Sequence, residues 1–242
     1  MSAFDRRRFF RYAAGATVAA GSAGWLARAI AGGTLRPTDK DVFIVVDVQK
    51  CFIPGGSLAV GNGHEVVPVI NAIARKFPYV VLTQDWHTAD HVSFASQHDG
   101  KKVFETVSLP YGTQVLWPDH CVQGTDGAAF APGLDIPHAQ LVIRKGYHSG
   151  IDSYSAFLEA DKKTPTGLAG YLKERGIKRC FLAGLATDFC VAWSAIDARK
   201  SGFEALVIED ASRGIDLNGS LAAAWKDMTS VGVKRIQSTD IA

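Results

Sequence analysis

Cys190 lies where a short apolar run gives way to a helical pattern. The run covers residues 180–183, and the helical pattern follows it closely. In open α/β sheets ligands bind at the carboxyl ends of the strands, and the positive amino end of a helix favours the thiolate, the form of cysteine that attacks carbonyl carbons. Cys190 is therefore a candidate nucleophile. The alternative is that it serves as a small buried hydrophobic residue.

Two charged residues follow other apolar runs in the same way. Asp47 comes directly after residues 42–46, and Lys145 follows residues 141–143 by two positions. Burial at a strand end would raise the pKa of Asp47 toward neutrality, which suits a general base. A loop carboxylate and a surface lysine are the alternatives. If the three strand ends share one edge, Asp47, Lys145 and Cys190 converge on one crevice.

Histidine and aspartate also form a candidate metal site. Asp85 and His87 are two positions apart, a spacing that points both side chains the same way on an extended chain. His120 supplies a further nitrogen, and two histidines with one carboxylate leave coordination positions open. This set suits zinc, iron and manganese alike, with zinc as the first expectation. His91 and His98 are also nearby, and His91 is kept as an outer or alternate ligand.

The elements that would position these residues alternate along the chain. Apolar, β-branched runs are typical of buried parallel strands, and the segments between them have helical periodicity. Strand followed by helix, repeated, predicts an α/β fold with a doubly wound, mostly parallel six-stranded sheet and helices on both faces. The predicted strands cover residues 42–46, 79–82, 141–143, 180–183, 205–208 and, more weakly, 231–236; the predicted helices cover residues 66–77, 166–175, 188–200 and 217–229.

One segment does not follow this alternation. Residues 86–139 are rich in histidine, glycine, proline and aspartate, and they are too long for a plain connection. Long loops in compact domains are usually functional. Because no repeat or internal boundary is visible, residues 32–242 are expected to form a single domain.

The first 31 residues are typical of a twin-arginine export signal. Arg6, Arg7 and Arg8 precede an aromatic pair, and an alanine- and glycine-rich stretch ends in Ala-Ile-Ala at residues 29–31. The stretch is short, rich in glycine and interrupted by Arg28, which disfavours the alternative of a transmembrane anchor. We expect a periplasmic or exported protein without a stable membrane anchor.

The net positive charge of the chain comes from this predicted signal. The full chain has a net charge of +2, and without residues 1–31 it has 21 basic and 23 acidic residues and a net charge of about −2. No basic run interleaved with aromatic residues suggests nucleic-acid binding. A small molecule is the expected partner, and the sequence leaves monomer and homo-oligomer open.

The four cysteines are expected to be unpaired. Cys51, Cys121, Cys180 and Cys190 show no paired spacing, and each lies in an apolar or motif context. About 211 residues after the predicted signal can bury a sufficient core without disulfides.

Seven short motifs lie along the chain. They are VDVQ at 46–49 with Phe52, GGSLAV at 55–60, TQDWH at 83–87 with HVSFAS at 91–96, WPDHCVQG at 117–124, KG at 145–146, DSYSAF at 152–157 and GLATDFCV at 184–191. In type and order they resemble the motifs of the nicotinamidase/pyrazinamidase branch of the isochorismatase-like cysteine hydrolases, and the resemblance covers nearly the whole chain from about residue 42 to residue 236.

The resemblance implies roles for the matching residues. It implies deamidation of nicotinamide, with pyrazinamide as a further substrate, through a cysteine thioester, and a cis peptide after Leu185. Lys145 would favour the charged forms of Asp47 and Cys190. The implied roles are Asp47, Lys145 and Cys190 as catalytic triad; Asp85, His87 and His120 as ligands of one divalent metal; Phe52, Leu58, Trp117 and Tyr154 around the substrate ring; and the amides of Ala186 and Cys190 as oxyanion hole.

Two features depart from the family pattern. Lys50 and Cys51 replace an asparagine and an aspartate beside the predicted site. The export signal is unexpected, because the pathway that recycles nicotinamide to nicotinate is usually cytoplasmic. The alternatives are a related metal-containing amidohydrolase acting on another carboxamide or carbamoyl compound, an isochorismatase, which needs no such cysteine, and an exported binding module for nicotinamide.

Overall fold

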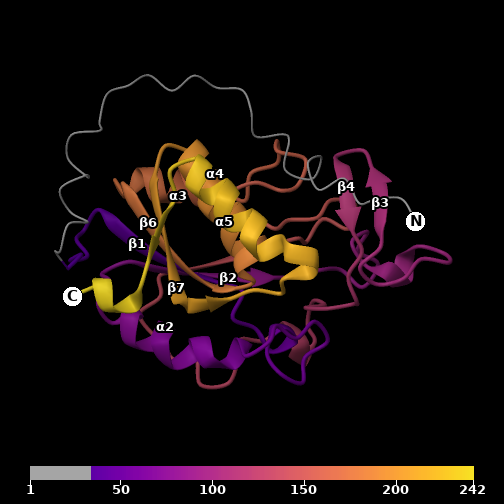
Figure 1. The fold of residues 1–242 in the computed structure, drawn as a ribbon, viewed down its shortest axis with the longest axis horizontal. Coiled ribbons are helices and arrows are strands. Elements are labelled where there is room, and N and C mark those ends of the chain that lie inside the picture. Colours follow the sequence, from indigo (N-terminus) through magenta and orange to yellow (C-terminus); the bar gives the residue numbers. More distant parts are fainter. Residues whose placement is uncertain (1–33) are drawn as a thin grey trace.

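A computed structural model describes residues 34–242 (Figure 1). The predicted export signal at residues 1–31 lies outside the described residues. Among the described residues, no helix is long and apolar enough to cross a membrane.

The core of the fold is a six-stranded sheet in which every described strand pair is parallel. Its strands are rich in valine, isoleucine, leucine and alanine, and the central ones are buried on both faces, as expected for parallel strands covered by helices. The strands are β1 (Asp41–Val46), β2 (Val80–Asp85), β5 (Leu141–Lys145), β6 (Arg179–Leu185), β7 (Glu204–Arg213) and β8 (Lys234–Ile236), in the spatial order β5-β2-β1-β6-β7-β8.

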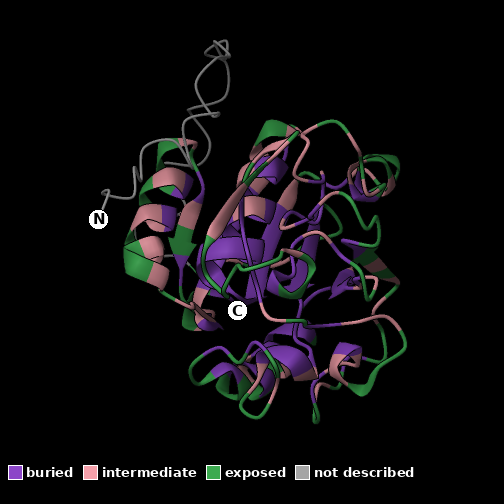
Figure 2. Cartoon of the chain, turned by 90° about the vertical axis from the view of Figure 1, so that its right-hand side faces the viewer, coloured by how far each residue is buried: buried purple, intermediate pink, exposed green. Residues whose placement is uncertain are grey.

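Helices cover both faces of this sheet. Alternate residues of β1 point to opposite sides: Phe43 and Val45 belong to one hydrophobic cluster, and Ile44 to another. The first cluster packs against α2 and the second against α3, α4 and α5 (Figure 1), while Figure 2 shows the buried residues running through the middle of the molecule. The predicted doubly wound α/β fold is therefore confirmed. The helices are α2 (Val66–Ala74), α3 (Leu168–Glu174), α4 (Ala192–Lys200) and α5 (Ser220–Ser230).

The order of the strands also defines where a site can form. From β1 the chain proceeds outward through β2 to β5, and it then returns to β6 on the other side of β1. The order reverses between β1 and β6, and ligands bind outside the carboxyl ends of strands at such a point. Gly184 lets these two strand ends approach closely, because a Cβ there would overlap the carbonyl oxygen of Val46.

The segment at residues 86–139, predicted to be too long for a plain connection, contains structure of its own. Strands β3 (Thr106–Leu109) and β4 (Gly112–Val115) form an antiparallel hairpin within it. The helix predicted at residues 188–200 begins instead with a π-helical turn, Thr187–Val191, before α4. Short 3-10 turns lie at Lys50–Phe52 (η2), Gly63–Glu65 (η3), Ala95–Gln97 (η4), Asp126–Ala128 (η5), Leu217–Gly219 (η7) and Ser238–Asp240 (η8).

The prediction that all four cysteines are unpaired is wrong. Cys51 and Cys121 form a disulfide, with their Cα atoms 5.7 Å apart, whereas Cys180 and Cys190 are buried free thiols. The two bonded residues are separated by 70 positions. Cys51 lies in the turn after β1 and Cys121 in the loop after β4, and the fold brings these segments together at one edge of the sheet. Spacing along the chain could not show this.

Candidate active site

The three residues of the predicted triad meet at the carboxyl edge of the sheet. Lys145 Nζ lies 2.8 Å from Asp47 Oδ2 and 3.4 Å from Cys190 Sγ. Lys145 ends β5, Asp47 follows β1, and Cys190 lies in the π-helical turn after β6. All three are buried. The geometry therefore brings a carboxylate, an ammonium and a thiol into direct reach of one another.

Asp47 has the environment of a base that works near neutral pH. Burial raises its pKa to about 6, although the neighbouring Lys145 ammonium acts in the opposite direction. Thr83 fixes the carboxylate, because its hydroxyl donates a hydrogen bond to Asp47 Oδ1 at 2.5 Å. The other oxygen, Oδ2, faces Lys145.

Cys190 does not have the thiolate character expected from its place before a helix. Burial raises the pKa of the Cys190 thiol well above its usual value, and the Lys145 cation only partly offsets this. The desolvation of a buried anion outweighs the helix amino end and one cation. The thiol is thus protonated in the resting site, and a nucleophilic role requires proton transfer to a base such as Asp47, whose carboxylate lies within 4.8 Å of the sulfur.

Lys145 joins the triad to the candidate metal site. Its ammonium contacts Asp85 Oδ1 as well as Asp47, and it donates a hydrogen bond to the Ser153 carbonyl at 2.9 Å. Burial alone would lower the pKa of Lys145, but the two carboxylates raise it well above its usual value. Lys145 is therefore a permanent cation with no nucleophilic character.

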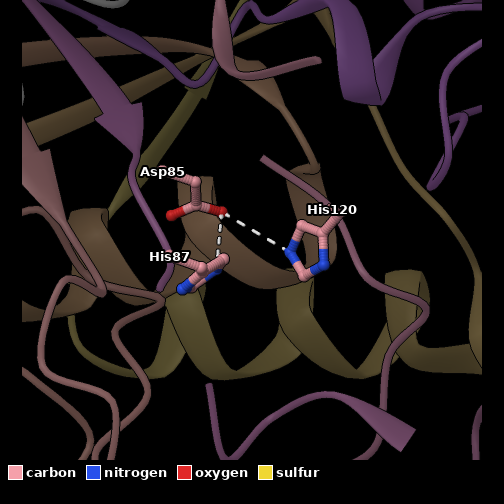
Figure 3. Close-up of side chains that lie close together, drawn as sticks. All are labelled: Asp85, His87 and His120. Carbon is pink, nitrogen blue, oxygen red and sulfur yellow. Dashed lines mark ion pairs between the residues drawn. The ribbon is translucent and has the colours of Figure 1, made fainter. Parts of the chain in front are cut away.

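The predicted metal ligands converge on one point (Figure 3). Asp85 Oδ2 lies 3.7 Å from His87 Nε2 and 3.9 Å from His120 Nε2. Each histidine uses its other ring nitrogen, Nδ1, to contact a backbone carbonyl at 2.8 Å, that of Gly146 for His87 and that of Pro118 for His120. Because a carbonyl oxygen can only accept a hydrogen bond, Nδ1 carries the hydrogen in these contacts, and in the neutral ring Nε2 is then the atom that can bind a cation.

The charge of the site also fits a cation. Burial would raise the pKa of Asp85, but its charged neighbours, Lys145 foremost, outweigh that effect and lower it, so this carboxyl is ionised. Donor set, tautomers and charge together suit a divalent ion such as zinc.

His91 lies behind this cluster. Its ring centroid is 4.2 Å from that of His87, but its Nε2 faces the Ile151 carbonyl at 3.2 Å and its Nδ1 faces the Ser93 hydroxyl at 2.7 Å. Both ring nitrogens of His91 thus already have partners, which favours a supporting place beside His87.

A pocket lies between the thiol and the metal-ligand cluster of Asp85, His87 and His120. Phe52, Leu58, Trp117 and Tyr154, predicted to surround a substrate, all line it. The Trp117 indole N–H donates a hydrogen bond to Tyr154 Oη at 2.9 Å, which orients both rings. Ala186 also lines the pocket, and the peptide between Leu185 and Ala186 is cis, as the resemblance implies.

Three pocket residues were not predicted as site residues. Asp152 and Phe189 lie inside motifs that the sequence shows, so their proximity to predicted residues was the available signal. Ile215 comes after β7 in a segment without a motif, and nothing in the sequence marks it.

Comparisons with known proteins agree with this geometry. A family model described as an isochorismatase domain matches residues 41–240. A nicotinamidase from Acinetobacter baylyi is 57% identical over 207 residues, which cover 86% of this chain and 97% of the relative. A solved nicotinamidase/pyrazinamidase structure from Acinetobacter baumanii is 61% identical with a TM-score of 0.83, covering 84% of this chain and 98% of that one. A pyrazinamidase from Pyrococcus horikoshii, solved in complex with zinc, is 36% identical with a TM-score of 0.68, covering 82% of this chain and 99% of that one.

Proposed function

The chain belongs to the isochorismatase family, and from this premise we propose that it is a nicotinamidase, which hydrolyses nicotinamide to nicotinate and ammonia. The observation that carries the proposal is the pocket itself. It has Cys190 on one side, three side chains that could hold a metal ion on the other, and aromatic residues along its walls. A flat heteroaromatic amide fits this arrangement, and pyrazinamide, which shares the ring amide, is a further substrate.

In the first step the thiol of Cys190 attacks the amide. Asp47 accepts the thiol proton, the sulfur bonds to the carboxamide carbon, and an electron pair moves to the carbonyl oxygen. We assign stabilisation of this oxyanion to the backbone N–H groups of Ala186 and Cys190. When the tetrahedral species collapses, Asp47 returns the proton to the nitrogen, the C–N bond breaks and ammonia leaves. A thioester on Cys190 remains.

In the second step water hydrolyses the thioester. Asp47 takes a proton from the water as its oxygen bonds to the thioester carbon. Collapse breaks the C–S bond, and the proton on Asp47 passes to the sulfur of Cys190. Lys145 holds Asp47 through their 2.8 Å ion pair and does not itself form a bond to the substrate.

We assign one divalent metal, with zinc as the first candidate, to Asp85, His87 and His120. When bound, such an ion would supply Lewis acidity beside the substrate ring. The free Nε2 atoms of the histidines and the ionised Asp85 support this assignment.

Ammonia release from nicotinamide by the purified, metal-loaded protein tests the function. Cys190→Ala is the matched control, because it removes the sulfur and leaves the pocket walls. We expect turnover in the wild type and at least a thousandfold loss, roughly, in the variant, with nicotinamide binding retained. If the wild type binds nicotinamide without releasing ammonia, the chain is a binding module. If it neither binds nor hydrolyses nicotinamide, it acts on another amide.

We further propose that the protein is exported through the twin-arginine pathway. The arginine-rich start of the chain supports this proposal, and so does the Cys51–Cys121 disulfide, since disulfides persist mainly in oxidising compartments. Replacing Arg6 and Arg7 by lysine should retain the protein in the cytoplasm. Unchanged export of that variant would refute the assignment.

A further inference from the structure

The two departures from the family motif at Lys50 and Cys51 both reach the same loop. Cys51 is bonded to Cys121, and Lys50 Nζ forms an ion pair with Asp126 Oδ1 at 2.5 Å. The Asp126 side chain is 82% exposed, so the ion pair contributes little to stability. The covalent link is buried, because both cysteines are only 1% exposed. Of the two contacts, the disulfide is therefore the stronger link between the segment after β1 and the loop at residues 121–126.

On one side of the disulfide, Cys121 lies between the two histidine ligands. It follows His120 directly in the chain, and its carbonyl accepts a hydrogen bond from the backbone N–H of His87 at 3.1 Å. The backbone N–H of Gln123 in turn donates to the His87 carbonyl at 2.8 Å. A displacement of Cys121 would therefore move the backbone of both histidines.

On the other side, Cys51 supports the wall of the pocket. It precedes Phe52 directly, and its carbonyl accepts a hydrogen bond from the backbone N–H of Leu58 at 3.0 Å. Phe52 and Leu58 both line the pocket, and the ring of Phe52 lies 5.5 Å from the ring of His120. The disulfide thus joins the segment that forms the apolar wall to the segment that carries the histidines.

We propose that Cys51 and Cys121 are positioning residues, and that their disulfide fixes the apolar wall relative to the histidine ligands and so sets how tightly the site holds its metal and its substrate. The effect on metal and substrate binding rests on the proposed function. The placement of the apolar wall relative to the two histidines rests only on the contacts around Cys51 and Cys121. In this protein a covalent bond joins two segments that the family motif, with an aspartate in place of Cys51, leaves unlinked at this point.

The alternative is that the disulfide acts only as a general staple that stabilises the folded state. Other contacts join the same segments: the backbone N–H of Lys50 donates to the Ala129 carbonyl at 2.9 Å, and the Gln49 amide donates to the Ala128 carbonyl at 2.9 Å. A variant without the disulfide should therefore fold, and local measurements can separate positioning from global stability.

Counting thiols in the exported full chain establishes the bond. In denaturant, two free thiols, Cys180 and Cys190, are expected to react. A trialkylphosphine should raise the count to four: phosphorus attacks one sulfur, the S–S bond breaks, and water supplies the oxygen of the phosphine oxide and the protons of both thiols. Four reactive thiols without the phosphine would overturn the proposal.

The decisive comparison is between Cys51→Ser and Cys180→Ala in the exported full chain. Cys180→Ala is the matched control, because it removes a buried thiol outside the site. In Cys51→Ser we expect metal loss to a chelator about tenfold faster than in the wild type, the range for groups that orient metal ligands. We also expect a higher KM for nicotinamide and faster amide exchange in residues 50–60 and 119–128. Cys180→Ala should match the wild type in all three measurements.

The outcomes separate the two proposals. If Cys51→Ser unfolds at lower denaturant but keeps wild-type metal loss, KM and local exchange, the disulfide is only a staple and the inference is wrong. If the wild type holds no metal or releases no ammonia, the proposed function fails. Local exchange then still decides whether the disulfide positions the two segments.

Discussion

Lys145 Nζ lies 2.8 Å from Asp47 Oδ2, with both side chains fully buried, and the same ammonium contacts Asp85 on its other side. One cation thus connects the candidate base to the candidate metal ligands. Because two buried carboxylates share it, a change in the charge of one alters the electrostatic environment of the other. The triad and the metal-ligand cluster therefore form one electrostatic unit.

Replacing Lys145 by methionine should destabilise the fold as well as abolish activity. The substitution leaves Asp47 and Asp85 buried without their cation, and removing one partner of a buried ion pair typically costs about 3–5 kcal/mol of unfolding free energy. Urea unfolding of wild type and variant measures this difference. Lys163→Met, at an exposed lysine, is the control and should be near neutral. A variant as stable as the wild type would contradict the ion-pair description.

The acidic side of the pH–rate profile should report Asp47. Its pKa is raised to about 6, and only its carboxylate form can accept the thiol proton. As the pH falls through about 6, Asp47 becomes protonated, and kcat/KM should fall by about tenfold for each further pH unit. Above that value the rate should reach a plateau until another group titrates.

Thr83→Val tests this assignment. The Thr83 hydroxyl donates to Asp47 and favours its charged form, which lowers the pKa of Asp47. Its removal should shift the acidic midpoint to higher pH by about one unit. If the midpoint of the acidic decrease in kcat/KM is unchanged in Thr83→Val, a group other than Asp47 is responsible for that decrease.

Much of this architecture could be predicted from the sequence, because its signals are local. Apolar runs identify strands, and the residues that end them, such as Asp47 and Lys145, share an edge once the strands are parallel. The pairing of Cys51 with Cys121 depends on contact between distant loops, which periodicity does not report. The protonated state of Cys190 could not be predicted either. It depends on the balance between burial, which raises the pKa of the thiol, and the Lys145 cation, which lowers it.

Gly146→Ala should loosen the metal site. A Cβ at this position would overlap the ring of His87, and the residue has a φ of +66° that favours glycine. The ring must move, and the contact between His87 Nδ1 and the Gly146 carbonyl is lost. We expect at least about tenfold weaker metal binding, measured by competition with a chromogenic chelator.

Gly202→Ala separates this clash from backbone strain. Gly202 also has a positive φ, +95°, but no described atom lies within 4 Å of the position that a Cβ would take there. This control should lose stability through strain while retaining wild-type metal affinity. Equal losses of metal affinity in the two variants would show that strain, and not displacement of His87, is responsible.

Asp188 should control substrate affinity without touching the reacting atoms. Its buried carboxylate accepts hydrogen bonds from the backbone N–H groups of Ile215 and Asp216, at 2.9 and 2.8 Å, and from the Ser220 hydroxyl. Ile215 lines the pocket, so Asp188 fixes one of its walls. In Asp188→Ala, a KM for nicotinamide about tenfold higher is expected, with a much smaller change in kcat, because Cys190 and Asp47 keep their contacts. Steady-state kinetics provides both values.

The control for Asp188→Ala is a substitution at Asp197, a buried aspartate that does not line the pocket. Asp197 in α4 is equally buried and pairs with Lys162 and Lys200. Asp197→Ala should therefore also lower stability, but it should leave KM unchanged, since none of its partners lines the pocket. If both variants raise KM to the same extent, the effect of Asp188 is general destabilisation; if only Asp188→Ala does so, the loop that carries Ile215 is a determinant of substrate binding.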